Sequence, residues 1–122
     1  VAPHTVRAIP GLFTRNERLV CLFDTPLGPM ALIMVGAIFV SCMETVWDGV
    51  VNPRMGLKLE QTLFGPSATQ SVALDRGDEM GRFNMGSTVI LLFEENRMNW
   101  SDDLQTATAI RLGQVIGQPA SQ

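Results

Sequence analysis

Residues 19–35, LVCLFDTPLGPMALIMV, decide the fold class of this chain of 122 residues. Two apolar runs are separated here by TPLGP, residues 25–29, and proline and glycine are residues that favour tight turns. Two extended apolar runs joined by so short a turn are typical of a β-hairpin. The sequence therefore predicts a hairpin over residues 19–35.

The rest of the chain repeats this pattern of short extended segments separated by turn residues. Eleven glycines and seven prolines are spread along it, and no segment predicts a helix of convincing length. The predicted fold is mainly β, with antiparallel strands, short loops and little helix, in a sandwich-like or barrel-like arrangement. Besides the hairpin, we expect extended segments at 39–47, 57–64, 71–83 (around a turn at Arg76-Gly77), 87–95 and 109–117, a loop at 48–56, an irregular polar segment at 95–109 and a frayed tail at 118–122.

The longest apolar stretch, MALIMVGAIFVSCM, covers residues 30–43. It is shorter than the roughly 20 residues that a transmembrane helix needs. The stretch is therefore predicted to be a buried strand, with a bulge or bend at Gly36.

Composition limits the function classes that this chain can serve. Hydrophobic residues make up 46% of the chain, enough for a core of ordinary size, and 9 basic against 12 acidic residues argue against a nucleic-acid surface. Cys21 and Cys42 lie in apolar runs and are expected to be buried free thiols, although a disulfide stays open. No spacing of cysteine and histidine predicts a metal site.

The chain is expected to form one domain, residues 1–122, or the C-terminal part of one catalytic domain. It begins without methionine and without a signal-peptide pattern, so we expect a piece of a longer chain.

Gly86-Ser87-Thr88 stands directly before the apolar run Val89–Phe93 and has two interpretations. In the first it is a turn before a strand, with the hydroxyl groups bonded to nearby backbone. In the second, the hydroxyl of Ser87 attacks the carbonyl of Gly86, because glycine adopts the unusual backbone conformation that such an attack needs. Thr88 is then a candidate donor to the developing oxyanion. The segment is not the nucleophile elbow of hydrolases, because Val89 replaces its second glycine.

Self-cleavage also needs a base, and the chain offers no patterned candidate. His4 is the single histidine, and we expect it to be a solvated side chain in an irregular segment rather than that base. Four carboxylates beside turns are expected to be surface charges and turn residues: Asp24, Asp48, Asp78 and Glu79. Trp47 and Trp100 are expected to be packing or interface residues rather than platforms for a ligand ring.

Taken together, residues 77–93, GDEMGRFNMGSTVILLF, resemble the C-terminal signature of the phosphatidylserine decarboxylase family. That signature has Glu-Met-Gly-Arg-Phe, here residues 79–83, followed by Leu-Gly-Ser-Thr and an apolar strand, and Met85 replaces its leucine. Three further blocks resemble the family's bacterial form, so the resemblance extends over nearly the whole chain: residues 9–37, 46–51 and 111–119.

The resemblance implies a proenzyme that cuts itself between Gly86 and Ser87. Attack by Ser87 gives an ester, and β-elimination with loss of ammonia leaves Ser87 as a pyruvoyl group, the only cofactor. Residues 1–86 would belong to the β chain and residues 87–122 would form the α chain. The pyruvoyl group forms a Schiff base with phosphatidylserine and accepts electrons as carbon dioxide leaves, giving phosphatidylethanolamine.

The resemblance also implies the partners of the chain. They are the phosphatidylserine substrate, a membrane surface and the upstream part of the same proenzyme, at the periphery of the bacterial inner (cytoplasmic) membrane, with a homodimer left open. The family's base is a histidine in an upstream two-histidine motif, assisted by an aspartate, and this chain contains neither motif. The chain alone is therefore expected to be inactive.

Two other functions stay open at this point. One is a non-catalytic β-rich binding or carrier module, whose glycine-rich turns present a surface. The other is a pyruvoyl decarboxylase that acts on a soluble amino acid.

Overall fold

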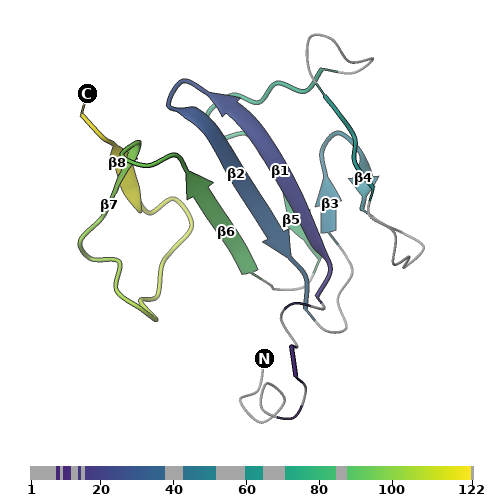
Figure 1. The fold of residues 1–122 in the computed structure, drawn as a ribbon, viewed down its shortest axis with the longest axis horizontal. Helices are drawn as coiled ribbons and strands as arrows, with labels where there is room; N and C mark the ends of the chain where they lie inside the picture. The colour runs from purple at the N-terminus through teal and green to yellow at the C-terminus, as the bar shows by residue number, and fades with distance from the viewer. Residues whose placement is uncertain are drawn as a thin grey trace. The chain divides into compact units, whose positions relative to one another are not determined.

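The computed structural model of the chain is strand-rich, which confirms the predicted mainly β class (Figure 1). It describes residues 8, 10–11, 14, 16–37, 43–51, 60–64, 71–84 and 88–121. The strands are β1 (Arg18–Thr25), β2 (Gly28–Val35), β3 (Met43–Thr45), β4 (Gly49–Val50), β5 (Gly81–Phe83), β6 (Thr88–Phe93), β7 (Met98–Trp100) and β8 (Gly117–Pro119). A sandwich or barrel arrangement stays a prediction.

The chain divides into two compact units that are interleaved in sequence. One unit contains Val1–Leu19 and Met34–Val89, and the other contains Val20–Ile33 and Ile90–Gln122. Neither unit is one continuous segment, so each depends on residues that are distant in the sequence.

The predicted hairpin forms β1 and β2, which are joined by a turn at Pro26 and Leu27. The Thr25 hydroxyl donates a hydrogen bond of 2.6 Å to the Gly28 carbonyl and accepts one of 3.1 Å from the Leu27 amide. Gly28 has a φ of 97°, which glycine adopts without a steric penalty. The turn residues therefore bring β1 and β2 together as a hairpin. β6 pairs with β2 and completes a sheet of order β1-β2-β6 (Figure 1).

A second sheet has the order β4-β3-β5, with β3 in the centre. Both pairings are antiparallel, and Thr45 of β3 lies opposite Gly49 on one side and Gly81 on the other. Met43 and Thr45 are buried, whereas Glu44 between them is only partly buried, because successive side chains of a strand point to opposite faces. The sheet is thus anchored on one face by Met43 and carries Glu44 on the other.

The C-terminal part of the chain differs from the sequence prediction. The expected strand at 109–117 is wrong, because the structure has β8 at Gly117–Pro119, paired antiparallel with β7 at Met98–Trp100. The segment predicted to be irregular thus contains a strand, and the tail predicted to fray is paired through Pro119. The Phe93 and Trp100 rings pack edge to face with centroids 5.9 Å apart. Two strands that pair across so long a loop give no signal in the local alternation of apolar and polar residues.

Other predicted boundaries were also too long. The strand expected over 30–43 ends at Val35, where the buried Gly36 donates its amide to the Glu17 carbonyl at 2.8 Å. The extended segment at 39–47 is reduced to β3 in its described part, and the loop at 48–56 contains β4. Residues 60–64 form no strand, which makes that part of the prediction for 57–64 wrong. The turn at Arg76-Gly77 is confirmed.

The core of the described residues is small. Its buried hydrophobic side chains are Cys21, Ile33, Met34 and Met43. Cys21 is a free thiol, as predicted, and its burial raises the pKa of that thiol, whereas Cys42 lies outside the described residues. Large apolar side chains remain exposed on the sheet β1-β2-β6: Val20, Leu22, Val89, Ile90 and Leu92. Exposed apolar groups in such number mark this sheet as a surface available for a further contact.

Gly81 is required by its contact with β3. A Cβ atom at this position would collide with the backbone carbonyl of Glu44. We expect Gly81→Ala to lower the free energy of unfolding by about 1–3 kcal/mol. The backbone of β3 cannot move away from the added Cβ atom as the end of a flexible side chain could. Urea unfolding of the full-length protein measures this difference.

Gly49→Asn is the matched control, since Gly49 pairs with the same residue, Thr45, from the opposite side. Its φ is 67° and a Cβ there meets nothing within 4 Å. Asparagine tolerates that conformation, so the loss should stay below about 1 kcal/mol. Equal losses for both variants would show that the contact with Glu44 is not the cause.

Candidate functional site

The bond singled out by the sequence lies between two described segments. Gly86 and Ser87 lie outside the described residues, as does His4, so their roles stay predictions. The described chain ends on one side at Asn84 and resumes at Thr88. Thr88 is exposed and is the first residue of β6. The geometry of the site is therefore that of the residues flanking the bond.

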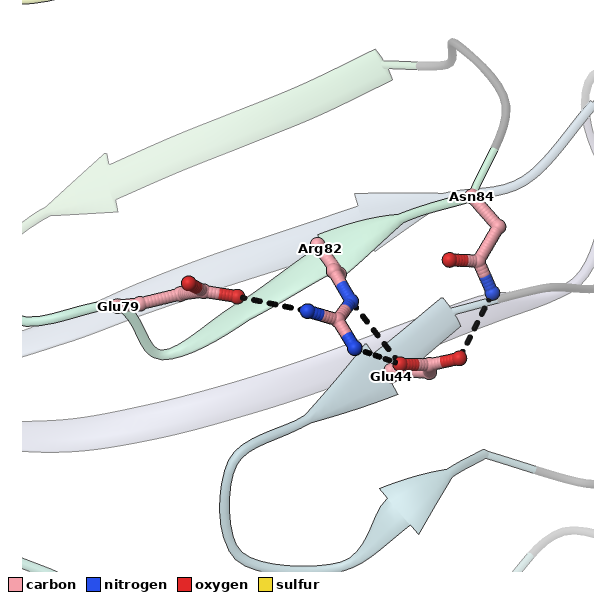
Figure 2. Close-up of polar contacts among 4 residues, drawn as sticks. All are labelled: Glu44, Glu79, Arg82 and Asn84. Carbon is pink, nitrogen blue, oxygen red and sulfur yellow. Dashed lines mark hydrogen bonds and ion pairs between the residues drawn. The ribbon is translucent and has the colours of Figure 1, made fainter.

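The flank before the bond is tied to β3 by an ion pair. Glu44 and Arg82 are direct partners across the antiparallel pair β3 and β5. Oε2 of Glu44 accepts hydrogen bonds from Nη2 of Arg82 at 2.7 Å and from Nε at 3.0 Å (Figure 2). Directly opposed residues of unlike charge are the pairs that stabilise a chosen register.

Two further residues complete this group, which we call the Glu44 cluster: Glu44, Glu79, Arg82 and Asn84. Nδ2 of Asn84 donates a hydrogen bond of 2.8 Å to Oε1 of Glu44, so both carboxylate oxygens have partners (Figure 2). Oε1 of Glu79 lies 3.9 Å from Nη1 of Arg82. The Glu44 side chain is 23% exposed, against 63% for Arg82. Of the two side chains in the ion pair, that of Glu44 is therefore the less exposed to solvent.

These contacts change the titration of the pair. The hydrogen bonds from Asn84 and Arg82 lower the pKa of Glu44, and the hydrogen bond to Glu44 raises the pKa of Arg82. Since the pKa of Glu44 is lower in the folded state, the contact is fully present above the unfolded-state pKa of about 4.3. It is lost as the pH falls through the lowered value. Glu44 and Arg82 therefore both stay charged throughout the neutral range.

Sequence reasoning missed most of this cluster. Glu79 was expected to be a surface charge, and its side chain is indeed 59% exposed, but its contact with Arg82 was not predicted. Glu44 and Arg82 are 38 positions apart, and only the register of β3 and β5 brings them together. The signal available in the sequence was weak: an acidic residue in one short strand and a basic residue in another.

The other predicted roles of charged and aromatic residues fit the structure where it describes them. The Asp78 carboxylate accepts a hydrogen bond of 2.8 Å from the Asp75 amide, as expected of a turn residue. Trp47 packs edge to face on Phe64, with ring centroids 6.2 Å apart. Within the described ranges, no group of three or more His, Cys, Asp or Glu side chains is placed to hold a metal ion.

An open hollow of about 450 Å³ lies on the sheet β1-β2-β6. Its lining is largely apolar, with Leu22, Met30 and Phe93, and its charged groups are Asp24 and Glu94. The lining contains no hydroxyl, thiol, imidazole or cationic side chain. In the described part of the chain, no helix has the length and apolar character needed to cross a bilayer.

Comparisons with known proteins agree with the resemblance seen in the sequence. The profile of the phosphatidylserine decarboxylase family matches residues 1–118. The chain is 48% identical over 120 residues to a phosphatidylserine decarboxylase proenzyme of Polaromonas sp. (strain JS666), covering 98% of this chain and 42% of that protein. It is 50% identical over 114 residues to the proenzyme of Azotobacter vinelandii, covering 93% and 40%. The chain thus spans about two fifths of these curated relatives.

Proposed function

Because this chain belongs to the phosphatidylserine decarboxylase family, we propose that it is the C-terminal part of a proenzyme that cuts itself between Gly86 and Ser87. The observation that carries the proposal is the match over residues 1–118, which includes the Gly-Ser-Thr segment. Relatives that are similar over nearly the whole chain are named proenzymes, which supports a cleaved precursor.

Ser87 supplies the nucleophile in this proposal. Its Oγ attacks the carbonyl carbon of Gly86, the peptide C–N bond breaks, and an ester joins Gly86 to Oγ with the amine of residue 87 free. β-Elimination then breaks the Cβ–Oγ bond and releases the Gly86 carboxylate. One water molecule enters and one ammonia leaves, so residue 87 becomes a pyruvoyl group. Thr88, exposed at the start of β6, is the proposed donor to the oxyanion.

The residues present fit such a group. Serine is the precursor from which a pyruvoyl group forms, and residue 87 directly precedes β6, so the group would be attached to the end of a strand. Its ketone, conjugated to an amide, supplies the electron sink for loss of carbon dioxide from the serine head group of phosphatidylserine.

The sheet β1-β2-β6 gives the cleaved product a way to stay assembled. Cleavage after Gly86 would leave β1 to β5 in the β chain and β6 to β8 in the α chain, residues 87–122. Since β6 pairs with β2, one sheet would contain strands of both chains (Figure 1). The two products would therefore be held by main-chain hydrogen bonds, as parts of one catalytic domain.

The base for cleavage belongs, in this proposal, to the upstream part of the proenzyme. The apolar side chains exposed on β1 and β6, such as Leu22 at 80% and Leu92 at 55%, support coverage by further chain. The enzyme would act on phosphatidylserine as a peripheral protein of the bacterial inner (cytoplasmic) membrane.

Mass spectrometry of a full-length proenzyme that contains this chain tests the proposal. We expect cleavage after Gly86 and an α chain that is lighter than the serine-initiated peptide by one ammonia. Borohydride should trap phosphatidylserine on the α chain, whereas free serine should not be trapped. An active, uncut protein would contradict the cleavage, and trapping of free serine would indicate a decarboxylase of a soluble amino acid instead.

A further inference from the structure

We propose that Glu44 is a positioning residue for self-cleavage, because it holds the segment that leads to Gly86 through Arg82 and Asn84 (Figure 2). This inference rests on the proposed function. It goes beyond that function by assigning a role to a residue 42 positions before the bond that is cut.

Glu44 has the anchorage that a positioning residue needs. It is the middle residue of β3, the central strand of the sheet β4-β3-β5. Its neighbours Met43 and Thr45 are buried, with 0% and 5% of their surface exposed. The backbone of Val51 donates to the Met43 carbonyl at 2.8 Å, and Val46 donates to the Met80 carbonyl at 3.1 Å. The Glu44 backbone is thus fixed by pairing on both sides and by packing beneath it.

The cluster acts where the chain leaves the sheet. Phe83, the last residue of β5, pairs with Met43, and Asn84 follows it. The bond of 2.8 Å from Nδ2 of Asn84 to Glu44 extends the attachment one residue past the strand pair. Asn84 is two residues before Gly86, and two residues span at most about 7 Å. Movement of Asn84 is therefore transmitted over a very short distance to the carbonyl that Ser87 attacks.

Self-cleavage is sensitive to such movement. The attacking oxygen and the carbonyl carbon must approach to about 3–3.5 Å in an aligned geometry, and a displacement of about 1 Å can slow a reaction roughly 100-fold. Exposed ion pairs, by contrast, contribute little to global stability. Loss of the cluster should therefore slow cleavage much more than it destabilises the protein.

The test is the rate of cleavage of the full-length proenzyme, followed by denaturing electrophoresis after synthesis. We expect Glu44→Ala and Asn84→Ala each to slow cleavage by about 10-fold to 100-fold. Glu44→Gln should recover a large part of the rate, because its carbonyl can still accept from Arg82 and its amide can donate to a reoriented Asn84. The decarboxylation rate per cleaved α chain should change by less than about twofold.

Arg97→Ala is the matched control. It removes the ion pair of Arg97 with Glu94, whose atoms lie 3.3 Å apart and whose side chains are 44% and 48% exposed. Its cleavage rate should stay within about twofold of that of the unmodified protein. In proteins that also carry Ser87→Ala and cannot cleave, Glu44→Ala should leave the thermal midpoint within about 3 °C.

The outcomes separate the inference from the function on which it rests. If the unmodified proenzyme is active without cleavage, the proposed function fails. If it cleaves, and Glu44→Ala and Asn84→Ala cleave at its rate, the positioning role is overturned while the function stands. Slow cleavage accompanied by a large fall of the thermal midpoint in the uncleavable background would also overturn it, because the cluster would then be structural.

Discussion

Replacing Ser87 by alanine is expected to abolish self-cleavage of the full-length proenzyme and, with it, decarboxylation. Alanine has no hydroxyl to attack Gly86 and no oxygen on Cβ to leave by elimination. Neither the new C-terminus at Gly86 nor the pyruvoyl group at residue 87 can therefore form. Removing the nucleophile of an enzyme lowers its rate by at least about 1,000-fold, and here it also removes the precursor of the cofactor. Electrophoresis should show one uncut chain, and assays of carbon dioxide release should show none above background.

Ser101→Ala is the control for this experiment. Ser101 lies in the described loop after β7, and its amide donates to the Ile116 carbonyl at 3.0 Å, a bond that alanine preserves. This variant should cleave and turn over like the parent. A Ser87→Ala protein that is still cut after Gly86 would show that another residue is the nucleophile, and would refute the proposed chemistry.

Met43→Ala is expected to have the largest effect on stability among the described residues. Met43 is fully buried at 0% exposure and lies in the central strand of its sheet. Truncation removes buried apolar contacts and leaves a cavity, which lowers the free energy of unfolding by about 2–5 kcal/mol. Urea unfolding of the full-length protein, with cleavage blocked by Ser87→Ala, measures the loss.

Two comparisons show whether burial is the cause. Met43→Leu keeps most of the volume and should lower the free energy of unfolding by less than about 1.5 kcal/mol. Leu112→Ala removes a fully exposed side chain and should change it by no more than about 0.5 kcal/mol. A loss for Met43→Ala no larger than that for Leu112→Ala would mean that the core around β3 is not as the structure describes it.

The parts of the fold that the sequence predicted correctly are those with local causes. Thr25 and Gly28 make the turn between β1 and β2 from within four residues, and the apolar run after Ser87 forms β6. The turn at Arg76-Gly77 is likewise made by neighbours, since the Asp78 amide donates to the Asp75 carbonyl at 3.1 Å. Turn chemistry and short-range alternation act within a few residues, so they can be recognised without knowledge of the partner strand.

The strands that were predicted wrongly are those that form only by pairing with another strand. The strands β7 and β8 are joined by a long loop, and neither was predicted with its observed bounds. The short strand β4 was predicted to be a loop, because two residues carry no periodic pattern and exist as a strand only through pairing with β3.

The sequence by itself determined the hairpin and the mainly β class, which depend on residue type and on spacing within short segments. Its resemblance to the phosphatidylserine decarboxylase family singled out the bond between Gly86 and Ser87 as the candidate for chemistry. Only the tertiary structure decided the contact of Glu44 with Arg82 and Asn84, because that contact depends on the register of β3 and β5. Register is set by pairing and burial of whole strands, and a shift of one residue would turn Glu44 to the buried face and break the cluster.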